Sequence, residues 1–206
     1  MVMNSEADRI EFCSGLNEGG LTPSLEDFLE LKQTGNKPIF VMIRPRGGDF
    51  VYSEEEFNQM KRDILAFRNK KADGFVFGIL DNYGTIDIHR NQQLIELAVD
   101  VPCSLHRAFD RGLSLVQNLE DAISCGFKTI LTSGMEKNVD LGQNNLKKLV
   151  DLSNGRINIL VGGGLRSSNL STIKEVTKAS QFHSSAILVA ESLPSLSEIS
   201  SLKQNI

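Results

Sequence analysis

Successive short apolar runs in this sequence end in residues that could bind a ligand or move a proton. They are a carboxylate and a thiol, two guanidinium groups, an imidazole with a second carboxylate, a hydroxyl and a glycine triplet: Glu11, Cys13, Arg44, Arg46, His106, Asp110, Ser133, Gly162, Gly163 and Gly164. Polar groups at the carboxyl ends of successive buried strands are typical of parallel barrels, whose active sites are built from the strand-to-helix loops. The order of these residues therefore predicts one site assembled from many segments.

Three of these residues are candidates for acid–base catalysis. His106 follows an apolar run, and the alternation of that run places His106 and Ser104 on the face opposite Cys103. An imidazole at a barrel mouth could be a general acid or base or a metal ligand, with Asp110 fixing its tautomer. Glu11 is a second group that could move a proton. The alternative is that His106 is a structural histidine whose hydrogen bonds are satisfied.

Two segments could bind an anion. Arg44 and Arg46 stand in the sequence RPRGGDF at 44–50, where two guanidinium groups lie beside backbone N–H groups freed by glycine. Such a pocket favours carboxylate or phosphate. The alternative is that both arginines form structural ion pairs with Glu11 or Asp49.

The glycine triplet at 162–164 reads as a loop between a strand and a helix that begins near Ser167. A loop of this kind near the end of a barrel often holds phosphate by its amides and by the helix dipole. Ser133, after the preceding strand, could contact the same anion. The alternative is that the glycines only permit a tight turn.

Cys13 is the candidate metal ligand. It alternates with Phe12, so that it projects into the barrel with Glu11 if Phe12 faces the helices. A soft thiolate suits Cu(I). Free cysteine is also commonly buried for packing reasons alone, and we interpret Cys103 and Cys125 in that way.

The apolar runs predict seven strands, at 9–13, 38–43, 74–79, 101–105, 128–131, 157–161 and 181–183. Six helical patterns lie between them, opened by Ser24, Ser53, Asp87, Ser114, Leu141 and Ser167, and Ser53 with Glu56 forms a capping box. This alternation predicts an α/β fold, a TIM-type (β/α)8 barrel that lacks its first strand and helix. An open doubly wound sheet is the alternative. We expect residues 1–206 to form a single domain.

Composition argues against several classes of protein. The 206 residues are 23% charged and 40% hydrophobic, which is typical of a globular protein and not of a disordered or membrane-spanning one. With 22 basic and 26 acidic residues, the net charge of −4 argues against nucleic-acid binding. The amino terminus lacks the features of a secretory signal, so we expect a cytosolic or nuclear location. Three cysteines without paired spacing argue against a disulfide framework.

About nine tenths of the sequence resembles the CutC copper homeostasis family. The resemblance is carried, in the family's order, by the segments at 7–16, 18–24, 40–50, 73–78, 106–110, 131–134, 162–164 and 182–185. It implies a (β/α)8-type barrel, a cytosolic location with the nucleus as a second one, and Cu(I) binding linked to copper tolerance or trafficking. It does not decide whether the chain is an enzyme.

The resemblance also marks a difference. The family begins with one more strand, whose cysteine has been proposed to share copper with the residue at Cys13, and residues 1–6 leave no room for that strand. The strands at 9–13 and 181–183 then have unpaired edges where a closed barrel has none. We therefore expect self-association into a homo-oligomer, recruitment of a strand, or reduced stability.

Three functions remain open from the sequence. The first is copper homeostasis through Cu(I) bound at Cys13, with Met42 or His106 as helpers. The second is a TIM-barrel enzyme for a small phosphorylated or carboxylated substrate, held by Arg44, Arg46 and the glycine loop at the barrel mouth. The third is a scaffold without catalysis.

Overall fold

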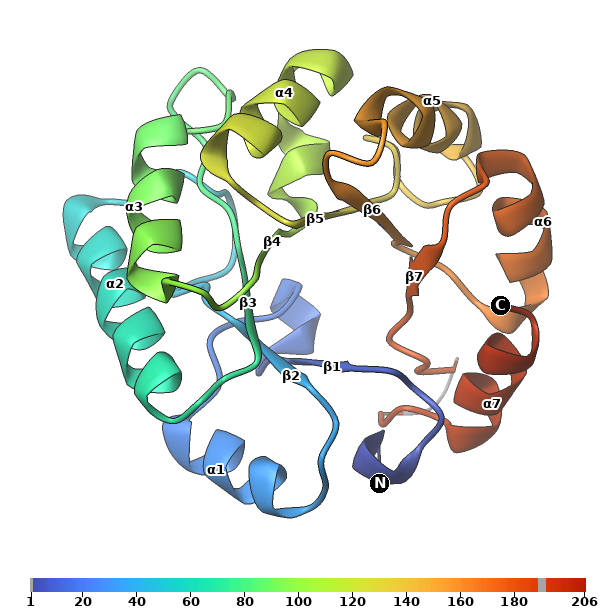
Figure 1. The fold of residues 1–206 in the computed structure, drawn as a ribbon, viewed down its shortest axis with the longest axis horizontal. Coiled ribbons are helices and arrows are strands. Elements are labelled where there is room, and N and C mark those ends of the chain that lie inside the picture. The colour runs from blue at the N-terminus through green and yellow to red at the C-terminus, as the bar shows by residue number, and fades with distance from the viewer. Residues whose placement is uncertain (1, 189–191) are drawn as a thin grey trace.

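Seven parallel strands form one curled sheet in which each strand lies beside the next one in the sequence, and the helices form an outer ring (Figure 1). The computed structural model describes residues 2–188 and 192–206. The strands are β1 (Ile10–Phe12), β2 (Ile39–Met42), β3 (Gly74–Phe77), β4 (Cys103–Leu105), β5 (Thr129–Thr132), β6 (Asn158–Gly162) and β7 (Gln181–His183). The seven predicted strands and the α/β barrel class are confirmed.

Helices follow the strands around the ring: α1 (Leu25–Gln33), α2 (Glu54–Asn69), α3 (Ile88–Ala98), α4 (Leu115–Cys125), α5 (Gln143–Ser153), α6 (Ser167–Thr177) and α7 (Leu196–Gln204). Short 3-10 turns are η1 (Val2–Asn4), η2 (Leu16–Glu18) and η3 (Arg107–Arg111).

Most helix starts follow the predicted capping residues. The side chains of Ser24, Ser53, Asp87 and Ser114 each accept a hydrogen bond from a backbone N–H of the first turn, and Ser53 forms the predicted capping box with Glu56. The fifth helix was predicted to open at Leu141 but begins two residues later, because Gly142 is its N-cap.

The helix α7 was not among the six predicted helices. Ser195 caps it, and its buried residue Glu198 accepts hydrogen bonds from the backbone N and the Oγ of Ser167, both at 2.7 Å. Ser167 is the first residue of α6, so the Glu198 carboxylate also faces the positive end of that helix. One side chain thus joins the last two helices.

We expect Glu198→Ala to lower the free energy of unfolding by about 1–2 kcal/mol, because two charge-assisted hydrogen bonds at a helix start are lost. Urea denaturation measures this change. Glu175→Ala, which removes an exposed carboxylate from α6, is the control and should change stability by less than about 0.5 kcal/mol. Equal effects of the two variants would contradict the role given to Glu198.

The side chains of each strand point alternately to the two faces of the sheet and so form two sets. Val41, Phe75 and Leu105 belong to the large hydrophobic core that includes the inward faces of the helices. The alternate residues Phe40, Met42 and Val76 form a small second cluster, and the partly buried Cys13 packs against it. Cys13 and Glu11 therefore project toward the barrel interior, as predicted.

The sheet does not close. Among the described residues, β1 pairs only with β2 and β7 only with β6. A cavity of about 870 Å³ lies along the two edges, lined by both strands and by α7, and its wall includes Glu11, Cys13, Gln181, His183 and Leu202. We call this region the seam. The unpaired edges agree with the predicted absence of one strand, and self-association across them stays a prediction.

The helices found in residues 2–188 and 192–206 are all too short or too polar to cross a membrane.

Candidate functional site

Arg44 follows β2 and is used to hold two loops together. It is buried, with 4% of its surface exposed. Its Nη1 donates to the carbonyl oxygens of Glu18 at 2.6 Å and Gly20 at 3.2 Å, and its Nη2 donates to the carbonyl of Gly48 at 3.0 Å. The guanidinium thus links the loop after β1 to the loop after β2, and these hydrogen bonds all go to backbone carbonyl oxygens.

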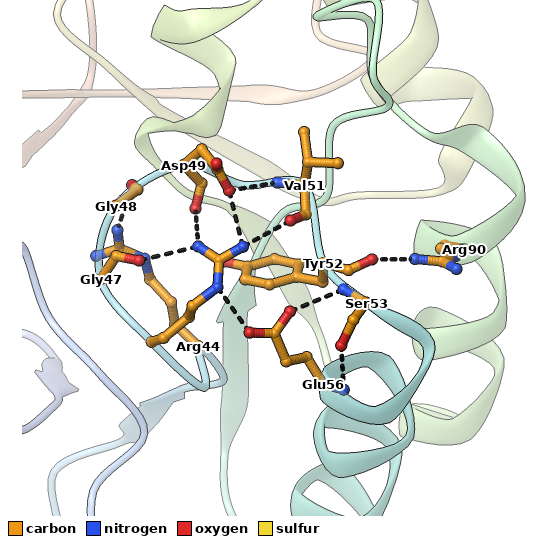
Figure 2. A network of polar contacts seen from close by, with 10 residues as sticks. Arg44, Gly47, Gly48, Asp49, Val51, Tyr52, Ser53, Glu56 and Arg90 are labelled. Atoms are coloured by element: carbon orange, nitrogen blue, oxygen red, sulfur yellow. Dashed lines mark hydrogen bonds and ion pairs between the residues drawn. The ribbon is translucent and has the colours of Figure 1, made fainter.

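Arg46 is held by the carboxylates of its own loop and of α2. The Arg46 guanidinium donates to Asp49, Val51 and Glu56, and Figure 2 shows these three residues in one polar network. The Arg46 Nη2–Asp49 Oδ1 distance is 2.8 Å and the Nε–Glu56 Oε1 distance is 2.7 Å. The hydrogen bond from Arg46 lowers the pKa of Asp49. The arrangement matches the structural ion pair that the sequence left as an alternative, and anion binding by Arg46 stays a prediction.

His106 is buried at the end of β4, with 3% of its surface exposed. Its Nδ1 accepts a hydrogen bond from the backbone N of Ala108 at 3.2 Å, and its ring lies 4.7 Å from that of Phe50, centroid to centroid. Burial, and secondly the charge of Arg44, lower the pKa of His106 to about 3. The imidazole is therefore neutral with its proton on Nε2, an atom without a hydrogen-bond partner among the described residues.

Asp110 does not orient His106 as the sequence suggested. Its carboxylate accepts hydrogen bonds from the side chains of Arg107 and Thr132 and from the backbone N atoms of Ser133 and Met135. The backbone N of Ala108, two residues after His106, fixes the tautomer instead. Asp110 joins η3 to the loop after β5, and any catalytic role for it stays a prediction.

The guanidinium beside the glycine loop is that of Arg107, to which the sequence assigned no specific role. Arg107 Nη2 donates to Ser133 Oγ at 2.7 Å, and a Cβ atom added at Gly163 would collide with Arg107 Nη1. Gly163 and Gly164 have positive φ angles of 106° and 80°, which favour glycine. The turn η3 brings Arg107 to this loop. The spacing of these residues in the sequence does not predict that contact.

Glu11, Cys13 and His183 line the seam. His183 Nδ1 lies 3.9 Å from Glu11 Oε2, so these two side chains approach each other across the open edges. Burial, and secondly the charge of Glu11, raise the pKa of the Cys13 thiol to about 11.

The three cysteines differ in their surroundings. The Cys103 and Cys125 thiols donate to the carbonyl oxygens of Val101 at 3.5 Å and Ile88 at 3.9 Å, and both residues are buried, as predicted for structural cysteines. No hydrogen bond is found for Cys13 Sγ within residues 2–188 and 192–206, and Cys13 is the partly exposed one. Cys13 is thus the thiol best placed to meet a ligand.

The predicted site residues fall into separate local groups. Glu11 and Cys13 lie at the seam, while Asp110, Ser133 and the glycine loop lie with Arg107 beside β4, β5 and β6. No hydrogen bond or ion pair between described residues joins these two groups. Within the same part of the chain, no three His, Cys, Asp or Glu side chains converge to form a metal site.

The sequence model of the CutC family matches residues 1–188. The chain belongs to the CutC family. The human copper homeostasis protein cutC homolog is 44% identical over 180 residues, which are 87% of this chain and 66% of that protein. The Caenorhabditis elegans protein of the same name is 40% identical over 201 residues, or 97% of this chain and 80% of that protein.

A solved CutC structure confirms the fold. The crystal structure of CutC from Streptococcus agalactiae matches with a TM-score of 0.79 and 35% identity, over 85% of this chain and 87% of that one. The chain spans about two thirds of the length of its human and mouse CutC relatives. The resemblance described from the sequence is therefore correct.

Proposed function

We propose that this chain is a cytoplasmic copper homeostasis protein that binds Cu(I) as its cargo, with Cys13 as a ligand. Its CutC relatives are named for copper homeostasis, and copper tolerance or trafficking is the role that we extend to this chain. The observation that carries the proposal is the position of Cys13: its thiol lines the seam cavity and makes no hydrogen bond to a described residue.

The residues at the seam fit a soft monovalent ion better than a hard divalent one. Cu(I) prefers sulfur and accepts few ligands, whereas hard cations need several oxygen ligands. Among the described residues no cluster of three or more His, Cys, Asp or Glu could hold a metal, so a site of high coordination number is not available there. Because the Cys13 pKa is raised, Cu(I) must displace a proton from the thiol when it binds.

The enzyme alternative draws little support from the contacts. Both arginines expected to hold an anionic substrate, Arg44 and Arg46, donate to protein atoms. The His106 side chain, which would move the proton, is buried beneath Phe50.

Cys13→Ser is expected to weaken Cu(I) binding by about 100-fold or more, because the soft ligand is replaced by a hydroxyl. The measurement is an anaerobic titration of the protein against a chromogenic Cu(I) chelator. Cys125→Ala removes a thiol that lies away from the seam and should leave the affinity unchanged. Unchanged affinity of Cys13→Ser would remove Cys13 from the copper site.

A further inference from the structure

Met42 lies beside Cys13 in the barrel interior. Phe12, the last residue of β1, pairs with Val41 of β2; Cys13 directly follows β1, and Met42 is the last residue of β2. Both project into the barrel and belong to the small interior cluster, where 3% of the Met42 surface is exposed. The ends of β1 and β2 thus bring a thiol and a thioether into one cluster in the barrel interior.

Gly20 packs closely against both side chains. A Cβ atom added at Gly20 would lie 3.3 Å from Cys13 Sγ and 3.3 Å from Met42 Cε, so the two side chains meet beside this glycine. The φ of Gly20 is +92°, a conformation that other residues rarely adopt. Arg44 Nη1 donates to the Gly20 carbonyl and helps to hold the loop in this position.

Two sulfur atoms suit Cu(I). The ion prefers soft thiolate and thioether ligands and forms sites of low coordination number. Methionine has three rotatable side-chain bonds, so its sulfur can turn toward a guest without a change of backbone. The seam cavity reaches Cys13, so an ion can approach its thiol from outside.

We infer that the Met42 thioether is a second ligand of the Cu(I) bound at Cys13, so that the two sulfur atoms hold the ion next to Gly20. This inference rests on the proposed function. It goes further in giving the site two named ligands from β1 and β2, in place of a lone cysteine.

The variant Met42→Leu tests the inference, because leucine keeps the volume of the side chain and removes its sulfur. We expect it to weaken Cu(I) binding by about 10- to 100-fold in the chelator titration. X-ray absorption of the copper-loaded protein should show two sulfur ligands in the wild type and one in the variant. Met60→Leu replaces a fully buried methionine of α2 and should change neither result.

Met42→Cys is the second variant. It restores a soft ligand at the same place, so its affinity should equal or exceed that of the wild type. Circular dichroism and thermal melting establish that each variant is folded before copper is added.

The outcomes separate the two proposals. Weak binding by Cys13→Ser together with unchanged binding and an unchanged sulfur count in Met42→Leu overturns the inference and leaves the proposed function in place. Unchanged binding by Cys13→Ser overturns both. Weak binding by both variants, with recovery in Met42→Cys, supports the two-sulfur site.

Discussion

Replacing Asp110 by alanine is expected to lower the free energy of unfolding by about 2–4 kcal/mol, because a buried carboxylate that accepts several hydrogen bonds is lost. Only 5% of the Asp110 side chain is exposed. Its two oxygens accept from Arg107 Nε, from the hydroxyls of Thr132 and Ser133, and from the backbone N atoms of Ser133 and Met135. The alanine variant leaves these donors without their acceptor, and Arg107 without its counter-charge.

Urea denaturation distinguishes a structural carboxylate from a catalytic one when three variants are compared: Asp110→Ala, Asp110→Asn and Asp49→Ala. Asparagine keeps one oxygen, so Asp110→Asn should fall between the wild type and the alanine variant. Asp49, whose side chain is 69% exposed, also pairs with an arginine, and its loss should cost less than about 1 kcal/mol. A fully stable Asp110→Ala would refute the structural role.

The second large effect is a loss of stability in mild acid caused by His106. Burial lowers its folded-state pKa from the ordinary value of 6.5 to about 3. Below pH 6.5 the unfolded chain binds a proton at this residue and the folded chain does not, so unfolding takes up a proton. The stability that this group contributes is therefore fully present above its pKa in the unfolded chain and is lost as the pH falls toward 3. From pH 7 to pH 5 the loss amounts to about 2 kcal/mol.

Denaturation at pH 5, 6 and 7 measures how the free energy of unfolding changes with pH, which is the slope compared between variants. This comparison separates the contribution of His106 from that of the carboxylates, which also titrate in acid. His106→Gln should lose this part of the slope, although it is less stable at pH 7. His89→Gln, which removes an exposed histidine of α3, should keep the wild-type slope. Parallel pH profiles for His106→Gln and the wild type would contradict the effect.

The sequence predicted the parts of the fold that depend on local signals. Apolar runs located the strands because both faces of a parallel barrel sheet are buried, and capping side chains located the helix starts because their partners lie three residues away. The helix α7 was missed because its anchor is distant: Glu198 bonds to Ser167, 31 residues earlier.

The contacts of the candidate site residues were only partly predicted, for the same reason. Cys13 and Glu11 were placed correctly in the barrel by strand alternation, which is local. The partners of Arg46 and Asp110 were not fixed by spacing, because they depend on how loops fold onto neighbouring elements: Glu56 lies on α2, and Thr132 ends β5. Arg107 was given no specific role although it adjoins His106, since the η3 turn brings it to Gly163.

Because the seam is open, the curled sheet has two ends. In a closed ring every strand has two neighbours, whereas here β1 and β7 have one each among the described residues. The molecule then resembles a short linear array, in which stability is passed from each unit to the next and the terminal units are held least firmly. Cys13 directly follows β1, so the thiol proposed to carry copper lies at one of these two ends.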